Sequence, residues 1–167
     1  MSTRRTLPFA KTLEIRDTCL CLSVQRAARA LARHFDEAFR PWGLTNGQFS
    51  LLVAVNRPHP PVMGEVAALL AMDRTTLTAA LKSLQRRGLV EARADEKDKR
   101  SRRLLLTQAG RALLAEAYPA WQEAHAGIDA RLAVPNPDRL RRDLLRLASG
   151  EPFAEPAQQM GRRRSPR

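Results

Sequence analysis

The stretch MGEVAALLAMDRTTLTAALKSLQRRGLVEARADEKDKRSRRLLLT, residues 63–107, decides the fold of this chain. Apolar residues recur at helical spacing in two successive segments, first as Val66, Ala67 and Leu70 and then as Leu77, Leu81 and Leu84. Asp73 lies between the segments, where its carboxylate can cap the second helix. Two short helices joined by a tight turn form a helix-turn-helix.

A charged β-hairpin follows the second helix. Gly88 is placed where that helix must end, and residues 89–93 alternate apolar and polar side chains as a strand does. Residues 103–106 supply the returning strand, so residues 95–101 form the tip of the hairpin. The sequence therefore predicts a wing beside the helix-turn-helix.

The second helix carries the side chains of a DNA-reading element. The N-terminal half of such a helix enters the major groove, where short polar and cationic side chains can meet base edges and phosphates. Arg74, Thr75, Thr76 and Thr78 occupy that half. Lys82, one turn after Thr78, would reach the DNA backbone.

The charge of the chain is concentrated in the same stretch. The whole chain has 29 Lys and Arg against 17 Asp and Glu, a formal net charge of +12, which attracts polyanions. Between Arg74 and Thr107, ten Lys and Arg against four acids give +6, half of the total. Double-stranded DNA is therefore the expected partner. The alternative is that these are ordinary solvated faces.

The surrounding sequence favours helices. With 167 residues and 44% hydrophobic side chains, the chain can bury a core, and its fold class is mainly α with a small β-hairpin. Further helices are expected over residues 13–39, 44–55, 108–129 and 138–147, and residues 57–62 form a rigid connector. Residues 1–12 are expected to be flexible, and residues 151–167 a disordered basic tail.

Several classes of protein are disfavoured. The sequence has no run of about 18 apolar residues that could span a bilayer, and no apolar core of signal-peptide length follows residues 1–10. A cytoplasmic location and no membrane partner are therefore expected. His34, His59 and His125 are scattered, without the spacing of a catalytic site or, with the two cysteines, of a metal site. We expect no enzyme activity, no metal and no cofactor.

Several motifs in order resemble those of MarR-family winged helix-turn-helix transcriptional regulators. They are LTNGQFSLL at 44–52, the segment 63–90 and DEKDKRSRRLLLTQAG at 95–110, and the resemblance runs from about residue 16 to 147. It implies a domain over residues 13–150, with a DNA-binding core at about 44–107 and dimerisation helices at about 13–40 and 108–149. It also implies a homodimer on a pseudo-palindromic operator and, most commonly in the family, repression.

The family resemblance also assigns roles in the wing. The family pattern is Asp-x-Arg-Asp-x-Arg, in which the central arginine enters the minor groove, and here Lys97 takes that position. A lysine lacks the planar fork of arginine, so discrimination is expected to be weaker. The expected wing contacts are Lys97, Lys99, Arg100 and Arg102. Asp95 and Asp98 are expected to brace neighbouring cationic side chains.

The terminal helices support a dimer independently of the resemblance. Each has an apolar stripe that a single chain of this size would leave partly bare, and a second copy would cover it. The alternative is that these helices pack only on each other within one chain.

In the family, small aromatic or phenolic acids bind between the dimerisation and DNA-reading regions. The resemblance points to an effector site lined by Cys19, Ser23, Arg26, His34, Trp42, Phe49 and Leu52. Arg26 could pair with a carboxylate. The alternative is that these residues are core or dimer contacts.

Cys19 and Cys21 allow a redox hypothesis, because one branch of the family senses peroxide through a cysteine near the start of its first helix. Two residues on a continuous helix lie about 200° apart, which disfavours a bridge between them. The alternatives to an effector-released repressor are thus a thiol-based redox regulator of the same fold and a winged-helix module that binds only proteins. Buried structural cysteines are the other interpretation.

Overall fold

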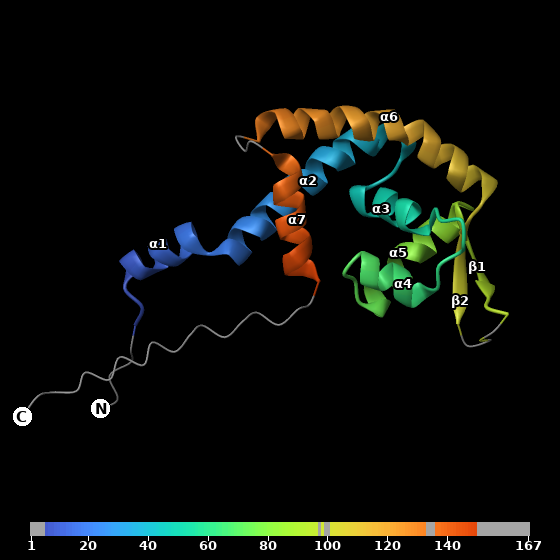
Figure 1. Cartoon of the computed structure of the whole chain (residues 1–167), viewed down its shortest axis with the longest axis horizontal. Coiled ribbons are helices and arrows are strands. Elements are labelled where there is room, and N and C mark those ends of the chain that lie inside the picture. The colour runs from blue at the N-terminus through green and yellow to red at the C-terminus, as the bar shows by residue number, and fades with distance from the viewer. Residues whose placement is uncertain (1–5, 97, 99–100, 133–135, 150–167) are drawn as a thin grey trace, which may run out of the picture. The chain divides into compact units, whose positions relative to one another are not determined.

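The computed structural model describes residues 6–96, 98, 101–132 and 136–149 (Figure 1). The described elements are α1 (Phe9–Thr18), α2 (Leu20–Phe39), η1 (Arg40–Trp42), α3 (Asn46–Val55), α4 (Met63–Leu69), α5 (Arg74–Arg86), β1 (Val90–Ala94), β2 (Arg102–Leu106), α6 (Gln108–Arg131) and α7 (Pro137–Ala148). The described residues up to Arg131 belong to one compact unit and α7 belongs to a second. The expected tail, residues 151–167, lies outside the described residues.

The winged helix-turn-helix is confirmed. The carboxylate of Asp73 caps α5 by accepting from the backbone N–H of Thr76 at 2.8 Å, and Gly88 ends that helix region with a φ of +68°. The two strands pair in antiparallel register from Val90 opposite Leu106 to Ala94 opposite Arg102. These details match the helix cap, helix end and hairpin expected from the sequence.

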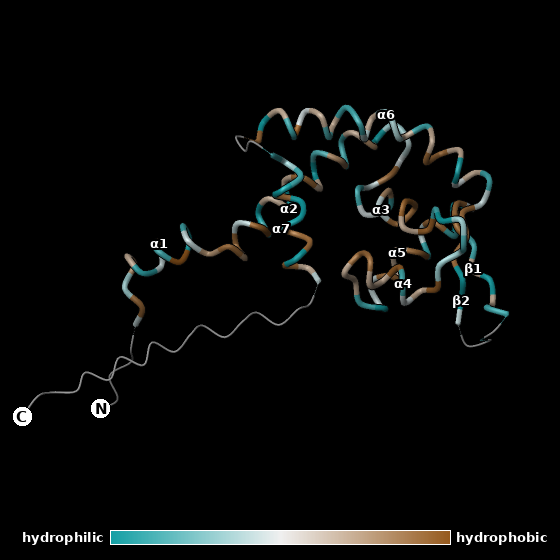
Figure 2. Tube along the Cα trace, viewed as in Figure 1, coloured by the Kyte–Doolittle hydropathy of each residue, from teal (hydrophilic) through white to brown (hydrophobic). Residues whose placement is uncertain are grey.

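One apolar core holds α3, α4, α5 and the hairpin together. Figure 2 shows α3 as hydrophobic over most of its length, and five of its ten residues are buried. The inner face of α5 meets this core, because Leu77, Leu81 and Leu84 are between 0% and 3% exposed. Burial of such side chains contributes about 2 kcal/mol each, so the recognition helix is held by its leucines.

The helices α2 and α6 pack side by side through aromatic rings (Figure 1). Phe39 stacks on Phe49 of α3 with ring centroids 4.2 Å apart, and the ring centroids of Phe35 and His125 of α6 are 5.9 Å apart. The ring centroid of His125 lies 4.7 Å from that of Trp121. These rings join the long helices to the winged core through α3.

The first long helix differs from the expectation. The sequence predicts a single helix over residues 13–39, whereas the structure has two helices separated at Cys19, whose φ of −72° and ψ of 107° are extended. The Sγ atom of Cys19 accepts from the N–H of Leu22 at 3.4 Å and so caps α2. The apolar residues at helical spacing lie in α2, whereas α1 has almost no apolar face, and no glycine or proline marks the break between them. The first helix also begins at Phe9, within the segment expected to be flexible.

A close backbone contact joins the start of α6 to the end of the recognition helix. The hydroxyl of Thr107 donates to the carbonyl of Gly88 at 2.7 Å and accepts from the N–H of Gly110 at 3.0 Å. A Cβ at Gly110 would lie 2.1 Å from the carbonyl oxygen of Leu89, a distance that side chains do not tolerate. Only glycine therefore permits this approach.

Apolar side chains are exposed outside the winged core. On α1 and α2 they include Phe9, Ile15, Leu20, Val24 and Leu31, and on α7 they are Leu140, Leu144, Leu145 and Leu147. Burial of these faces would require another surface. Among the described residues, no helix is both long and apolar enough to cross a membrane.

Candidate nucleic-acid interface

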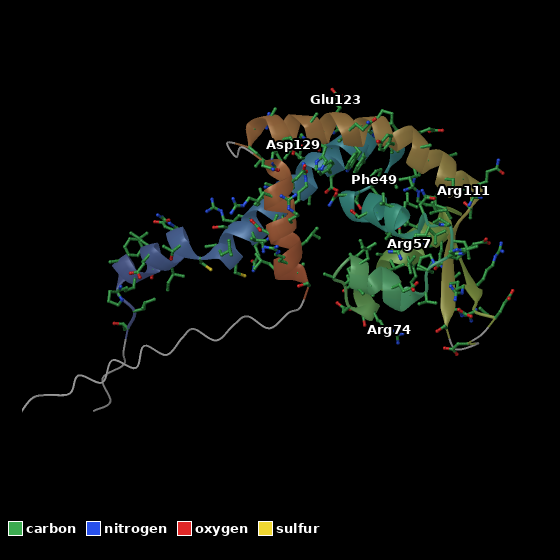
Figure 3. The ribbon with its side chains drawn as sticks, in the orientation of Figure 1. Phe49, Arg57, Arg74, Arg111, Glu123 and Asp129 are labelled. Atoms are coloured by element: carbon green, nitrogen blue, oxygen red, sulfur yellow. The ribbon has the colours of Figure 1, made fainter. Side chains whose placement is uncertain are left out.

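The outer face of α5 is cationic and hydroxylated. Arg74, Thr75, Thr76, Thr78 and Lys82 are all exposed, as the sequence predicted for groove-facing residues. Figure 3 shows Arg74 at the outer edge of the helix-turn-helix, directed away from the core. Within the part of the chain that the structure describes, Arg74, Thr75 and Lys82 have no side-chain hydrogen bond or ion pair. Their donors are available to a ligand.

The other two threonine hydroxyls are already engaged. Thr76 donates its hydroxyl hydrogen to a carboxylate oxygen of Asp73 at 2.7 Å, and Thr78 donates to the carbonyl of Arg74 at 2.7 Å. These oxygens can still accept a hydrogen bond, and the methyl groups can contact a thymine methyl. Thr76 and Thr78 are therefore suited to accepting and apolar contacts, while Thr75 can also donate.

The helix cap is stable at neutral pH. Hydrogen bonds from the backbone and then the side chain of Thr76 lower the pKa of Asp73 below its ordinary value. A carboxyl group whose pKa is lowered by folding stabilises the fold above its unfolded pKa and loses this contribution as the pH falls through the lowered value. At neutral pH the cap is thus charged, and it sits at the positive end of the helix dipole.

The base of the wing is held by a buried ion pair. Asp95 is 5% exposed and is the buried charged residue among the described core positions. Its carboxylate lies 2.6 Å from the Arg103 guanidinium, which also donates to the carbonyl of Pro60 at 2.7 Å. The expected bracing role of Asp95 is therefore seen, with Arg103 as its partner. The pair joins both strands of the wing to the connector before α4.

The tip of the wing is only partly described. Lys97, Lys99 and Arg100 lie outside the described residues, so their expected DNA contacts stay predictions. Arg102 is exposed at the start of β2. Asp98 accepts from the hydroxyl of Ser101 at 3.0 Å, a contact within the tip.

The structure separates two arginines that the charge count treated alike. Arg86 has no side-chain partner among the described residues, whereas Arg87 donates to the carbonyls of Gly43 at 2.7 Å and Trp42 at 3.0 Å. No local sequence signal distinguishes the two, because the carbonyls that Arg87 binds lie 44 and 45 residues away. Arg87 is thus a structural contact as well as a surface charge.

The seven expected effector residues lie on or near three elements of the described structure. Four lie along or just before α2 (Cys19, Ser23, Arg26 and His34), Trp42 is half-buried in η1, and Leu52 is fully buried. Phe49, also on α3, lines a hollow of about 500 Å³ between α3 and α6. Its other lining residues, which sequence reasoning missed, are Val53, Asn56, Arg111, Leu114, Ala115 and Tyr118.

The hollow combines apolar walls with one cation. Figure 3 shows Phe49 on α3 and Arg111 near the start of α6. Arg111 donates one N–H to the carbonyl of Leu106 at 2.6 Å and has no carboxylate partner among the described residues. Its remaining donors can meet an anionic group, and the ring of Tyr118 is half exposed at the rim.

Both cysteines are free thiols. Cys19 is half-buried and Cys21 is exposed, and the amide nitrogen of Gln25 lies 3.2 Å from the Sγ atom of Cys21. Because Cys19 lies outside a regular helix, the angular separation expected on a continuous helix does not apply to this pair. No group of side chains suited to a metal ion was found among the described residues.

Comparisons with known proteins agree with this geometry. The model of the MarR family matches residues 42–101. The transcriptional regulator MosR of M. tuberculosis, solved in complex with DNA, is 42% identical, with a TM-score of 0.70 over 78% of this chain and 93% of that one. The transcriptional repressor CouR, bound to a 23-mer DNA duplex, is 28% identical, with a TM-score of 0.65 over 86% of this chain and 96% of that one.

A curated relative covers less of the chain. The uncharacterised HTH-type transcriptional regulator YybA of Bacillus subtilis is 31% identical over 92 residues, which are 55% of this chain and 59% of YybA. The match thus spans little more than half of that relative's length. MosR and CouR share the fold described above over most of their lengths.

The ion pair at the wing base predicts a difference between two arginines that face each other across the hairpin. Replacing Arg103 with Met should lower the free energy of unfolding by about 2 kcal/mol, because the buried Asp95 carboxylate loses this cation while Arg103 itself is partly exposed. Arg93→Met, the matched control, removes only an exposed pair with Glu91 and should cost about 0.5 kcal/mol or less. Urea denaturation at pH 7 measures both, and equal losses would contradict a special role for the buried pair.

Proposed function

Because the chain belongs to the MarR family of DNA-binding transcriptional regulators, we propose that it is a homodimeric repressor of a pseudo-palindromic operator. Each protomer places α5 in the major groove and its wing in the adjacent minor groove. A small aromatic or phenolic acid releases the repressor from DNA. The observation that carries the proposal is the outer face of α5, where cations and hydroxyls stand on a helix fixed by buried leucines.

The side chains of α5 divide the work of binding DNA. Arg74 has five N–H donors and no partner in the described chain, so it can read a guanine edge or hold a phosphate. Thr75 and Thr78 offer hydroxyls and methyls to base edges, and Lys82 reaches a phosphate. In the wing, Lys97 enters the minor groove, assisted by Lys99, Arg100 and Arg102.

Exposed apolar faces support the homodimer. Phe9 is 74% exposed and Leu20 is 60% exposed on the N-terminal helices, and Leu145 is 69% exposed on α7. Side chains of this size rarely face water in such numbers unless a partner covers them. A second copy of the chain is the partner that also presents two recognition helices to a two-fold-symmetric site.

Selection of bound duplexes from a random pool tests the dimer and the reading helix together. A dimer should recover a two-fold-symmetric sequence, and binding to it should weaken steeply as salt rises. Arg74→Ala should weaken binding by about 1 to 3 kcal/mol and relax one position of the site if Arg74 reads a base. Arg29→Ala makes the same charge change on α2 and should leave the selected sequence unchanged. Absence of binding to any duplex, or an asymmetric site together with a monomer in light scattering, would refute the proposal.

The hollow between α3 and α6 is the proposed effector site. Its apolar walls accept an aromatic ring, and Arg111 can receive the carboxylate. Because the hollow lies between α3 of the winged core and the long helix α6, an occupant can change how the two helices are positioned. Of the seven residues that the family resemblance suggested for the effector site, Phe49 is the one that also lines this hollow.

Filling the hollow should abolish the response to effector without abolishing DNA binding. Ala115→Trp introduces an indole into the hollow, whereas Ala112→Trp places one on an exposed part of the same helix that does not line it. We expect benzoate or a hydroxybenzoate to release the wild type and Ala112→Trp from DNA, but not Ala115→Trp. A gel shift with increasing ligand measures this. Equal release of all three proteins would place the site elsewhere.

A thiol-based redox regulator is the second candidate function. The observation that favours it is the position of Cys19 at the break between α1 and α2, two residues from the exposed Cys21. Two thiols there could be oxidised to a disulfide by hydrogen peroxide, which would take up the two electrons and two protons and form water. A change at this break would alter the helix that carries the dimer surface.

Peroxide distinguishes the redox function from release by an effector. DNA binding of the wild type should fall after mild peroxide and recover with dithiothreitol, whereas Cys19→Ser and Cys21→Ser should bind unchanged. Gel shifts before and after treatment measure this. If peroxide leaves wild-type binding unaltered, the redox function is excluded.

A further inference from the structure

We propose that Gln48, Ser83 and Arg87 are positioning residues that set the tilt of the recognition helix for DNA reading. Together with the carbonyls of Trp42 and Gly43 they form what we call the recognition-helix clamp. The inference rests on the proposed role of α5 as the groove-reading helix. It assigns DNA specificity to residues that lie away from the DNA-facing half of that helix.

Arg87 makes the strongest part of the clamp. It is the residue that directly follows α5, and its two terminal nitrogens donate to two consecutive carbonyls, Gly43 at 2.7 Å and Trp42 at 3.0 Å. Those carbonyls belong to the short connection between α2 and α3, where Gly43 has a φ of +60°. A guanidinium can bridge both because its donors are fixed in one plane. The contact therefore fixes direction as well as distance.

Gln48 makes the second part. Its amide oxygen accepts from the N–H of Thr45 at 3.0 Å and caps α3, while its amide nitrogen donates to the hydroxyl of Ser83 on α5 at 3.1 Å. One side chain thus joins the start of α3 to the C-terminal half of α5. The same start of α3 is tied to α2, because Asp36 accepts from the N–H of Asn46 at 2.6 Å. A continuous polar path leads from α2 to the recognition helix.

Polar contacts restrict the tilt of α5 more narrowly than its apolar face does. Leu77, Leu81 and Leu84 hold the helix against the core, but apolar contacts tolerate small changes of angle. Hydrogen bonds have narrow ranges of distance and angle. The clamp and the Thr107 hydroxyl on Gly88 are both near the C-terminal end of α5. Hydrogen bonds therefore fix the C-terminal end of α5 relative to α2 through the clamp and relative to α6 through Thr107.

The opposite end of α5 carries the proposed DNA contacts. The 13 residues of α5 span about 20 Å, so a tilt of about 10° at the clamp moves Arg74 by about 3 Å. A hydrogen bond to a base edge does not survive such a displacement. Contacts with phosphates through long flexible side chains are less sensitive to it. Loss of the clamp should therefore reduce specific binding more than non-specific binding.

The decisive comparison is Arg87→Lys against Arg86→Lys. Both variants keep the charge, but a lysine cannot bridge two carbonyls as the fork of Arg87 does. Arg86 has no such contact with any described residue. The full chain is titrated with the duplex selected from a random pool and with a scrambled duplex at one salt concentration. We expect Arg87→Lys to lower the ratio of specific to non-specific affinity by roughly 2- to 30-fold. Arg86→Lys should leave that ratio unchanged.

A second variant distinguishes loss of the clamp from a general folding defect. Ser83→Ala removes the hydroxyl that Gln48 binds and leaves the cap of α3 intact, and it should lower the same ratio with a nearly unchanged Tm. Unchanged ratios in both Arg87→Lys and Ser83→Ala would overturn the inference, as would equal effects of Arg86→Lys and Arg87→Lys. If these ratios stay constant while Arg74→Ala still weakens binding, only the clamp is refuted. If Arg74→Ala has no effect either, the role of α5 fails with it.

Discussion

Burial of one leucine face fixes the recognition helix and makes every other feature of the interface possible. Leu77, Leu81 and Leu84 face the core, so the residues between them must face outward on a helix with 3.6 residues per turn. This helix geometry alone exposes the cations and hydroxyls of α5, without contacts of their own. The wing depends on the same core, because Leu104 and Leu106 of β2 are buried in it. The strand that follows the wing tip is therefore anchored in the core.

Much of this arrangement could be predicted from the sequence, because its signals are local. The steps of three and four between leucines, the cap at Asp73 and the glycine at position 88 each act within one turn of helix, and the structure has all three. The sequence does not reveal the break at Cys19, because no glycine or proline stands there and the apolar face that predicts the helix lies in α2 alone. The positive φ of 50° at Ala71, in the turn of the helix-turn-helix, was also missed, since alanine rarely adopts that conformation.

The less predictable features join residues far apart in the chain. Arg103 finds Asp95 across the hairpin and Pro60 in the preceding connector, and Arg87 reaches back to the segment before α3. A charge count assigns all such arginines to the DNA-binding surface, whereas the structure gives some of them internal partners. The hollow beside Arg111 has the same origin, because α3 and α6 meet only when the chain is folded.

The contact between Gly110 and Leu89 affects whether the winged core can be separated from α6. Winged helices are often regarded as modules that recombine with different partner domains, which requires a connecting segment with few contacts. Here the first turn of α6 touches the backbone at the start of β1, and Thr107 shares hydrogen bonds with both sides of the junction. The boundary is therefore a packed joint and not a linker. A chimaera that grafts this winged core onto another helical frame would have to carry the beginning of α6 with it.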